Sequence, residues 1–214
     1  YPLVTSVFGR ESDVDGDGRV LFLLTPLVNQ VGGVAGFYSA ASALPTNRGG
    51  NGNLSDMMYL SPDREMTFYR SLLAHEFQHL INFNQHVLVR PGGNSEESWL
   101  NEALSHLTED LVGDHTAGGN NNLVETFLAH PERFPLTGDA LLNLGVRGAA
   151  YLFLRGLTDQ KGHGVLSSLT QSTKVGAANV EAVAGKPFPD LYRQWAAQLF
   201  LSGTQLNADP SLNY

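Results

Sequence analysis

Residues 64–88 constrain the fold of this 214-residue chain more than any other stretch, because they contain neither Pro nor Gly. Such a stretch predicts one long helix, and its apolar residues fall on more than one side, as in a helix buried within a protein. Two histidines, His75 and His79, lie within it. Imidazoles on a buried helix need polar partners, so these two side chains require an explanation.

The spacing of the two histidines suggests a metal ion as their partner. Residues four apart on a helix lie one turn above each other on the same face, so His75 and His79 can converge on one ion. Glu76 is turned aside, where its carboxylate can reach a water molecule instead of the metal. This is the H-E-x-x-H pattern of zinc hydrolases, which chance gives in about one chain in a hundred of this composition. Ordinary core histidines are the alternative.

A catalytic zinc ion usually has three protein ligands, so one more is needed. His86 is out of register with the pair, and we expect it at the surface or beside a ligand. Glu102 lies among apolar residues of a second predicted helix, where an unpaired carboxylate is costly. It follows His79 by 23 residues (102 − 79), enough for a turn and an antiparallel return. The sequence therefore predicts zinc bound by His75, His79 and Glu102.

The second helix follows the run RPGGN at residues 90–94, which ends the first. We expect Ser95 to be its N-cap, with Glu96 and Glu97 in the first turn, where carboxylates complement the helix dipole. That placement would give Glu96 and Glu97 a structural role.

Residues 75–83 (HEFQHLINF) and 99–106 (WLNEALSH) resemble the corresponding motifs of the hyicolysin-type bacterial metallopeptidases, within the wider gluzincin group that includes thermolysin. The resemblance is specific over residues 66–110 and extends weakly to residues 13–29 and 148–156. It implies a secreted zinc endopeptidase with His75, His79 and Glu102 as ligands and Glu76 as general base. It also implies a substrate cleft between a sheet-bearing N-terminal part and a helical C-terminal part.

The chain departs from thermolysin-like enzymes at His106, where they have an Asp that orients the first zinc histidine. A ligating imidazole normally needs such an acceptor to fix its tautomer. Asn101, Glu109, Asp110 or a backbone carbonyl could supply it, and the sequence does not choose among them.

Related gluzincins also stabilise the negative charge on the substrate carbonyl with a Tyr or His from a downstream helix, and Tyr151 is our candidate. The small residues before it, at 148–150, would let this helix pack closely. A core tyrosine on an amphipathic helix is the alternative.

Strand patterns come first along the chain and helix patterns after them, which predicts an α+β fold. Short segments rich in β-branched and aromatic residues indicate a small sheet, and after residue 64 nearly every pattern is helical. We expect subdomains at 1–88 and 89–214 that together form one catalytic unit. The predicted strands are 2–8, 20–28, 34–40 and 57–60; the predicted helices lie near 64–88, 96–112, 120–130, 144–158, 163–172 and 187–202.

Two further segments have open interpretations. Asp13, Asp15 and Asp17 alternate before Gly18 like the first half of an EF-hand loop, but position twelve is Leu24 instead of Glu. They form either a calcium site that borrows a ligand or an Asp/Gly turn. Residues 32–37 (GGVAGF) could be a sheet edge that binds a peptide backbone, or a flexible hairpin.

Trp99, Trp195 and the Phe residues near 194–200 are expected in the core. The remaining histidines, His115, His130 and His163, are expected at the surface.

A net charge of −8 argues against nucleic acid and anionic membranes as partners. The resemblance to hyicolysin-type peptidases implies a protein or peptide substrate. The longest apolar run, at 20–28, is far too short to span a membrane, and the lack of Cys rules out disulfides and thiolate sites. A chain that begins at Tyr1 without Met is either processed or truncated, and we expect that a leader or propeptide has been removed upstream. Secretion is what the resemblance to hyicolysin-type peptidases implies.

Two other functions compete with peptidase activity. Zinc held by the same three residues could only staple two helices together, although structural sites are usually closed by a fourth protein ligand. The second competing function is that of an adhesion module, in which residues 13–17 bind calcium and the peptidase motif is degenerate.

Overall fold

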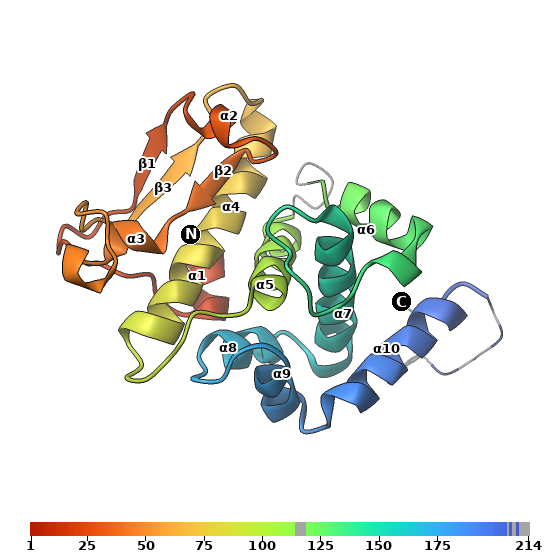
Figure 1. The fold of residues 1–214 in the computed structure, drawn as a ribbon. Helices are drawn as coiled ribbons and strands as arrows, with labels where there is room; N and C mark the ends of the chain where they lie inside the picture. Colours follow the sequence, from red (N-terminus) through yellow and green to blue (C-terminus); the bar gives the residue numbers. More distant parts are fainter. Residues whose placement is uncertain (114–118, 205, 207–208, 210–214) are drawn as a thin grey trace.

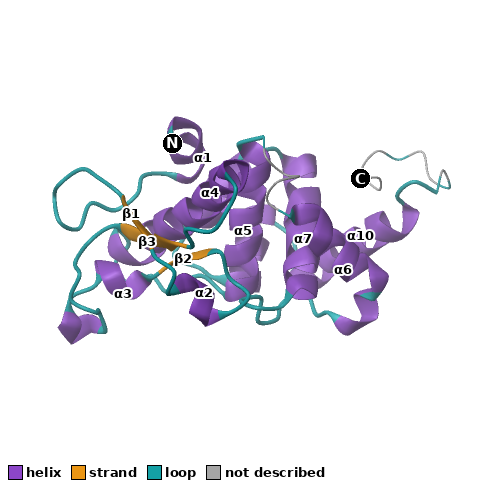
Figure 2. Ribbon diagram, turned by 90° about the horizontal axis from the view of Figure 1, so that it is seen from above, coloured by secondary structure: helices purple, strands orange, loops and turns teal. Residues whose placement is uncertain are grey.

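The computed structural model describes residues 1–113, 119–204, 206 and 209 of the chain. A small sheet lies on one side of a long helix and a group of helices on the other, so the α+β prediction is confirmed (Figure 1). Seen from above, helices α5, α7, α6 and α10 lie to one side of the sheet and α4 (Figure 2). The division into subdomains at residue 88 stays a prediction.

The sheet has three strands, β1 (Leu21–Leu24), β2 (Gly36–Tyr38) and β3 (Met57–Leu60), in the order β1-β3-β2. Strand β1 is parallel to β3 and β2 is antiparallel to it, with Phe37 opposite Tyr59. Their rings stack with centroids 4.9 Å apart, which helps to fix the register. Strand β2 is therefore an edge strand, and Figure 1 shows it beside helix α4. Short helices α2 (Val28–Val31) and α3 (Ala40–Ala43) flank it.

The strand predicted at residues 2–8 is wrong, because these residues form helix α1 (Pro2–Phe8). Pro2 occupies the first helical turn, where a missing N–H is harmless. Val4 and Phe8 lie one turn apart and are both buried in the core. Helix α1 packs against α4 and α8, so tertiary contacts override the β propensity of this segment.

The helical part is built on α4 (Met66–Phe83), α5 (Ser98–Leu111) and α7 (Leu144–Lys161). Helix α5 returns antiparallel to α4, since Ser71 meets Glu109 near one end and Gln78 meets Ser105 near the other. Helix α4 continues into the π-helical turn Asn84–Leu88. Helices α6 (Asn120–Ala129), α8 (Gly164–Thr170) and α10 (Phe188–Leu201) pack on α7, and α9 (Gly176–Ala184) packs on α8 and α10. Short 3-10 turns lie at Thr46–Arg48 and Pro131–Arg133.

The predicted start of the second helix is wrong. Helix α5 begins at Ser98 with Glu97 as N-cap, so Ser95 does not cap it and Glu96 precedes it. Glu96 is instead buried against α9, a helix that the sequence analysis missed. Its carboxylate accepts hydrogen bonds from the backbone N–H of Gly176 at 2.6 Å and from Asn179 at 3.0 Å.

The expectation for His86 is also wrong, because this residue is completely buried in the π-helical turn under α8. Its Nε2 donates to the carbonyl of Leu169 at 3.2 Å. Trp99 and Trp195 are buried as predicted, but Phe200 is 76% exposed because the last turn of α10 leaves it uncovered.

His130 and His163 are exposed as expected, and His115 lies outside the described residues. Within the described part of the chain, no helix is long and apolar enough to cross a membrane.

Candidate metal centre

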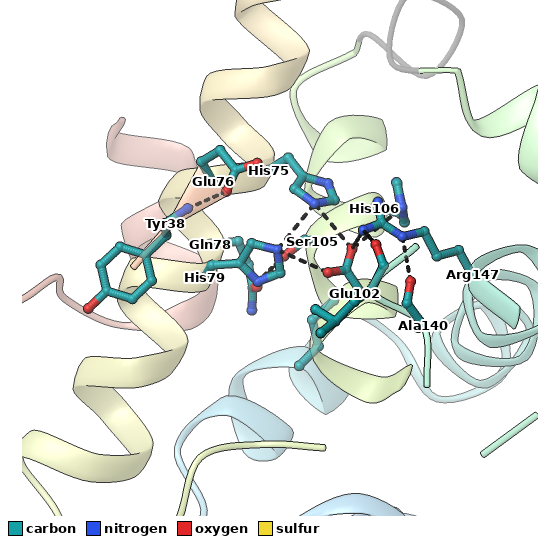
Figure 3. A network of polar contacts seen from close by, with 12 residues as sticks. Tyr38, His75, Glu76, Gln78, His79, Glu102, Ser105, His106, Ala140 and Arg147 are labelled. Carbon is teal, nitrogen blue, oxygen red and sulfur yellow. Dashed lines mark hydrogen bonds and ion pairs between the residues drawn. The ribbon is translucent and has the colours of Figure 1, made fainter. Parts of the chain in front are cut away.

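Helices α4 and α5 bring the three predicted zinc ligands together (Figure 3). The Nε2 atoms of His75 and His79 lie 3.2 Å apart. The two oxygens of Glu102 lie 3.4 Å from Nε2 of His75 and 3.6 Å from Nε2 of His79. The three side chains come from facing sides of an antiparallel helix pair, as their spacing in the sequence requires.

The second ring nitrogen of His79 is held by a chain of hydrogen bonds. The hydroxyl of Ser105 donates to the side-chain carbonyl of Gln78 at 2.6 Å. Its oxygen can therefore accept from Nδ1–H of His79, at 3.1 Å. With the proton on Nδ1, the Nε2 lone pair of His79 faces Glu102 and His75 and is free to bind a cation.

Glu109 takes the corresponding role for His75, so the structure selects it from the acceptors that the sequence left open. Its Oε1 accepts from Nδ1 of His75 at 2.9 Å and from Nδ1 of His106 at 2.8 Å. Its Oε2 accepts from the hydroxyl of Ser71 at 2.6 Å. These bonds direct Nε2 of His75 toward Glu102. His106 is the second imidazole bound to the carboxylate of Glu109.

The charges around His75 favour a cation at this position. Burial alone would lower the pKa of His75, but hydrogen bonds to Glu102 and Glu109 outweigh it and raise the pKa to about 10. Burial would raise the pKa of Glu102, yet His75, His79 and Arg147 hold it well below its usual range. For Glu109 the imidazoles of His106 and His75 overcome burial and lower the pKa to about 2. The surplus of negative charge suits a divalent metal ion.

Glu76 points away from the three ligands and toward the sheet (Figure 3). Its side chain is buried, and Oε2 accepts the backbone N–H of Tyr38 in β2 at 2.8 Å. The carboxylate lines the same cavity as the ligands but is fastened to the edge strand. This placement suits a general base that acts on a water molecule.

Arg147 is a site residue that the sequence analysis missed. Its Nη2 lies 3.1 Å from Oε2 of Glu102, and the guanidinium also donates to the carbonyl of Ala140 (Figure 3). A further hydrogen bond goes to the carbonyl of Leu141. One signal was available, because Arg147 lies only four residues after Asn143, the N-cap of α7, and a cation near a helix N-terminus opposes the helix dipole. Such a residue needs a nearby carboxylate.

The structure does not bring Tyr151 to the metal ligands. Its hydroxyl donates to Asp110 at 2.7 Å, and burial together with this bond raises its pKa. Tyr151 is absent from the described residues that line the cavity. A role for Tyr151 in catalysis stays a prediction that would require its side chain to turn.

The ligands lie in the wall of a cavity of about 690 Å³ between the sheet and the helices. Helix α4 runs parallel to β2, since a methyl of Leu72 lies near Gly36 and the ring of Phe83 packs on Tyr38. Both halves of α4 contribute to the lining, Phe68 and Leu72 from the first half and Asn82 and Phe83 from the second. The lining also includes Tyr38, Ser95, Glu96, Leu123, Leu141 and Leu142.

The carboxylates of Asp13, Asp15 and Asp17 come together in an exposed loop. Asp13 accepts the backbone N–H of Gly18 at 3.0 Å, and Asp15 accepts the hydroxyl of Ser55 at 3.1 Å. The Asp/Gly turn is therefore present, and calcium binding there stays a prediction.

The sequence is similar to that of a bacterial metalloprotease. It is 28% identical over 179 residues to the neutral metalloprotease ShpI of Staphylococcus hyicus, a match that covers 76% of this chain. The chain spans 40% of the length of ShpI. No known family profile matches the sequence.

Proposed function

We propose that this chain is the catalytic part of a secreted zinc endopeptidase that acts on extended polypeptide. The observation that carries the proposal is the convergence of His75, His79 and Glu102 at one point in the wall of an open cavity, with Glu76 beside them. Similarity to a neutral metalloprotease supports the same reaction class.

The donor set suits zinc. Two imidazole nitrogens and a carboxylate oxygen are usual ligands of catalytic zinc, and each imidazole has its second nitrogen fixed by a hydrogen bond. When bound, zinc would supply a Lewis acid for the substrate carbonyl and make water a nucleophile near neutral pH. The competing structural role requires a fourth protein ligand. Among the described residues His106 is nearest to supplying one, with Nε2 3.9 Å from Glu102.

Glu76 performs the proton transfers in this proposal. Its carboxylate takes a proton from the attacking water and delivers it to the leaving amine. The backbone N–H of Tyr38 holds one carboxylate oxygen, which leaves the other available for the proton. Arg147 provides a cation beside the ligands, and it is better placed than Tyr151 to lie near negative charge that develops in the cavity.

The substrate would bind as an added strand on β2. The backbone N–H of Ser61 donates to the carbonyl of Ala35, so Ala35 and Phe37 face β3, and Gly36 and Tyr38 face away from it. Tyr38 uses its outward N–H for Glu76, and the backbone groups of Gly36, a buried residue of the cavity lining, also face away from β3. Backbone pairing of this kind gives affinity with little side-chain selectivity.

Three further expectations belong to the proposal. The protein is secreted after removal of a leader or propeptide, and calcium binds at Asp13, Asp15 and Asp17. The third expectation is that the whole protein acts on protein or peptide substrates, which is proposed here because the chain spans less than half the length of ShpI.

Cleavage of casein by the zinc-loaded chain, beside its Glu76→Gln variant, tests the proposal. We expect Glu76→Gln to retain zinc and to lose activity by roughly 10²–10⁴-fold, the usual contribution of a general base. The matched control Glu65→Gln makes the same change on an exposed residue at the start of α4 and should cleave normally.

If none of the proteins cleaves casein although zinc is bound, the result would favour a structural role for the zinc ion. X-ray absorption would then count the imidazoles on zinc. Two would exclude closure by His106, and three would support it.

A further inference from the structure

The guanidinium of Arg147 joins two parts of the cavity that are distant in the sequence. On one side Nη2 lies 3.1 Å from Oε2 of Glu102, a predicted metal ligand on α5. On the other side Nε donates to the carbonyl of Ala140 at 2.7 Å and Nη2 to that of Leu141 at 2.6 Å. A planar guanidinium has fixed donor directions, so moving either partner strains its bonds to the other.

Residues 139–142, called the wall below, carry Leu141 and Leu142 into one side of the cavity, while Ala140 is buried in the core. The side chains of Leu141 and Leu142 are largely exposed. Leu142 reaches across the mouth, because a methyl of its side chain would lie 3.9 Å from a Cβ placed on Gly33 in the opposite wall. The wall is also held by the buried side chain of Ala140 and by the hydroxyl of Ser98, which accepts the N–H of Ala140 at 3.2 Å.

Glu102 depends on Arg147 in turn. Its Oε2 is buried and lies 3.1 Å from Nη2 of Arg147 and 3.4 Å from Nε2 of His75, and Arg147 is the only Lys or Arg among the described residues that line the cavity. The same guanidinium therefore sets the direction of this carboxylate and the position of the wall.

We propose that Arg147 is a positioning residue that couples the metal ligand Glu102 to the wall at residues 139–142. A metal ion that fixes Glu102 also orders the wall, and a polypeptide that orders the wall strengthens metal binding, since such coupling is reciprocal. The inference rests on the proposed metal site and is independent of whether the bound metal cleaves peptides.

Arg155 provides a matched control. It lies on the same helix α7 and its Nη1 is 3.0 Å from Oδ2 of Asp110, also on α5. It is absent from the described lining of the cavity. Arg155→Gln therefore removes an arginine between the same two helices without touching Glu102 or the wall.

Hydrogen exchange of the whole chain, with and without zinc, tests the coupling. The amides of Ala140 and Leu141 report the wall directly, because they donate to the side chains of Ser98 and Asp139. We expect zinc to slow their exchange several-fold in the wild type and in Arg155→Gln, and not in Arg147→Gln. Zinc affinity in Arg147→Gln should fall about 10–100-fold, as for other residues that orient a ligand.

Equal protection of the wall by zinc in Arg147→Gln and wild type would overturn the coupling, as would no protection in the wild type. If Arg147→Gln does not fold, Arg147→Lys serves instead. A single ammonium cannot reproduce both sets of contacts, so protection should be lost while the charge is kept. Failure of casein cleavage with intact zinc-dependent protection would count against the proposed function and not against the coupling.

Discussion

Helix α4 and its π-helical extension carry two buried histidine–glutamate clusters that differ in chemistry. At His75 and His79 the free nitrogens converge on Glu102 and open onto the cavity. At His86, Nε2 is used by the carbonyl of Leu169, while Glu96 accepts backbone and amide N–H groups and lies 3.8 Å away.

The pKa shifts of the two clusters differ at the carboxylates and at His75. Burial raises the pKa of Glu96 and lowers that of His86, so both neutral forms are favoured. The shifts of His75 and Glu102 favour their charged forms, whereas burial lowers the pKa of His79 and of His106 as it does that of His86. Burial of a histidine beside a glutamate therefore does not by itself indicate a metal site. Free, converging nitrogens and surplus negative charge are the distinguishing features.

The largest difference between the two clusters should appear when one carboxylate in each is replaced with an amide. Glu102→Gln removes a ligand, so zinc affinity should fall by more than the 10–100-fold typical of losing an outer partner, and activity should vanish. Glu96→Gln should bind zinc as the wild type does. Isothermal titration of both variants measures this, and equal loss in both would contradict the distinction.

Asn179→Ala should destabilise the second cluster without affecting the first. Its Nδ2 donates to Glu96 at 3.0 Å and to the carbonyl of Leu169 at 2.8 Å, and both acceptors are left buried. A loss of about 1–3 kcal/mol in the free energy of unfolding is expected, measured in urea. A change in zinc affinity would show instead that the clusters are coupled.

The pH dependence of zinc affinity should further distinguish the His75 cluster from the His86 cluster. Glu102 and Glu109 raise the pKa of His75 to about 10, and a proton on His75 must leave before a metal binds. Zinc affinity should therefore fall about tenfold for each unit of pH between about 9 and 7. Glu109→Gln should flatten this slope. A wild-type slope that begins only below pH 6.5 would contradict the role of Glu109.

The smallest effect is expected for Ser105→Ala, which removes the acceptor of Nδ1–H of His79. Zinc affinity should fall several-fold, about 1 kcal/mol, because the imidazole loses the bond that fixes its tautomer. Ser167→Ala, on α8, is the matched control. An unchanged affinity in Ser105→Ala would mean that helix packing alone orients His79.

The sequence predicted the parts of the site that local periodicity controls. Spacing on one helix placed His75, Glu76 and His79, and apolar surroundings singled out Glu102. Strand β3 was found at its observed bounds, Met57–Leu60. These features depend on a period of 3.6 or 2 and on neighbours close in sequence.

The errors arose where distant contacts decide. Residues 2–8 have strand propensity, but α1 is buried against α4 and α8. His86 is covered by α8, and Glu96 is bonded to α9, which begins at a glycine and was missed. Arg147 meets Glu102 across 45 residues (147 − 102), beyond any local pattern.

Because α7 packs closely on α6, a substitution outside the site can abolish activity. A Cβ on Gly148 would lie 2.1 Å from the carbonyl oxygen of Leu123, so any larger residue must push the two helices apart. Arg147 is the preceding residue and would move with the helix, away from Glu102. Random mutagenesis should therefore yield inactive clones at Gly148, a position that contacts neither ligand nor substrate, and their second-site revertants should map to α6.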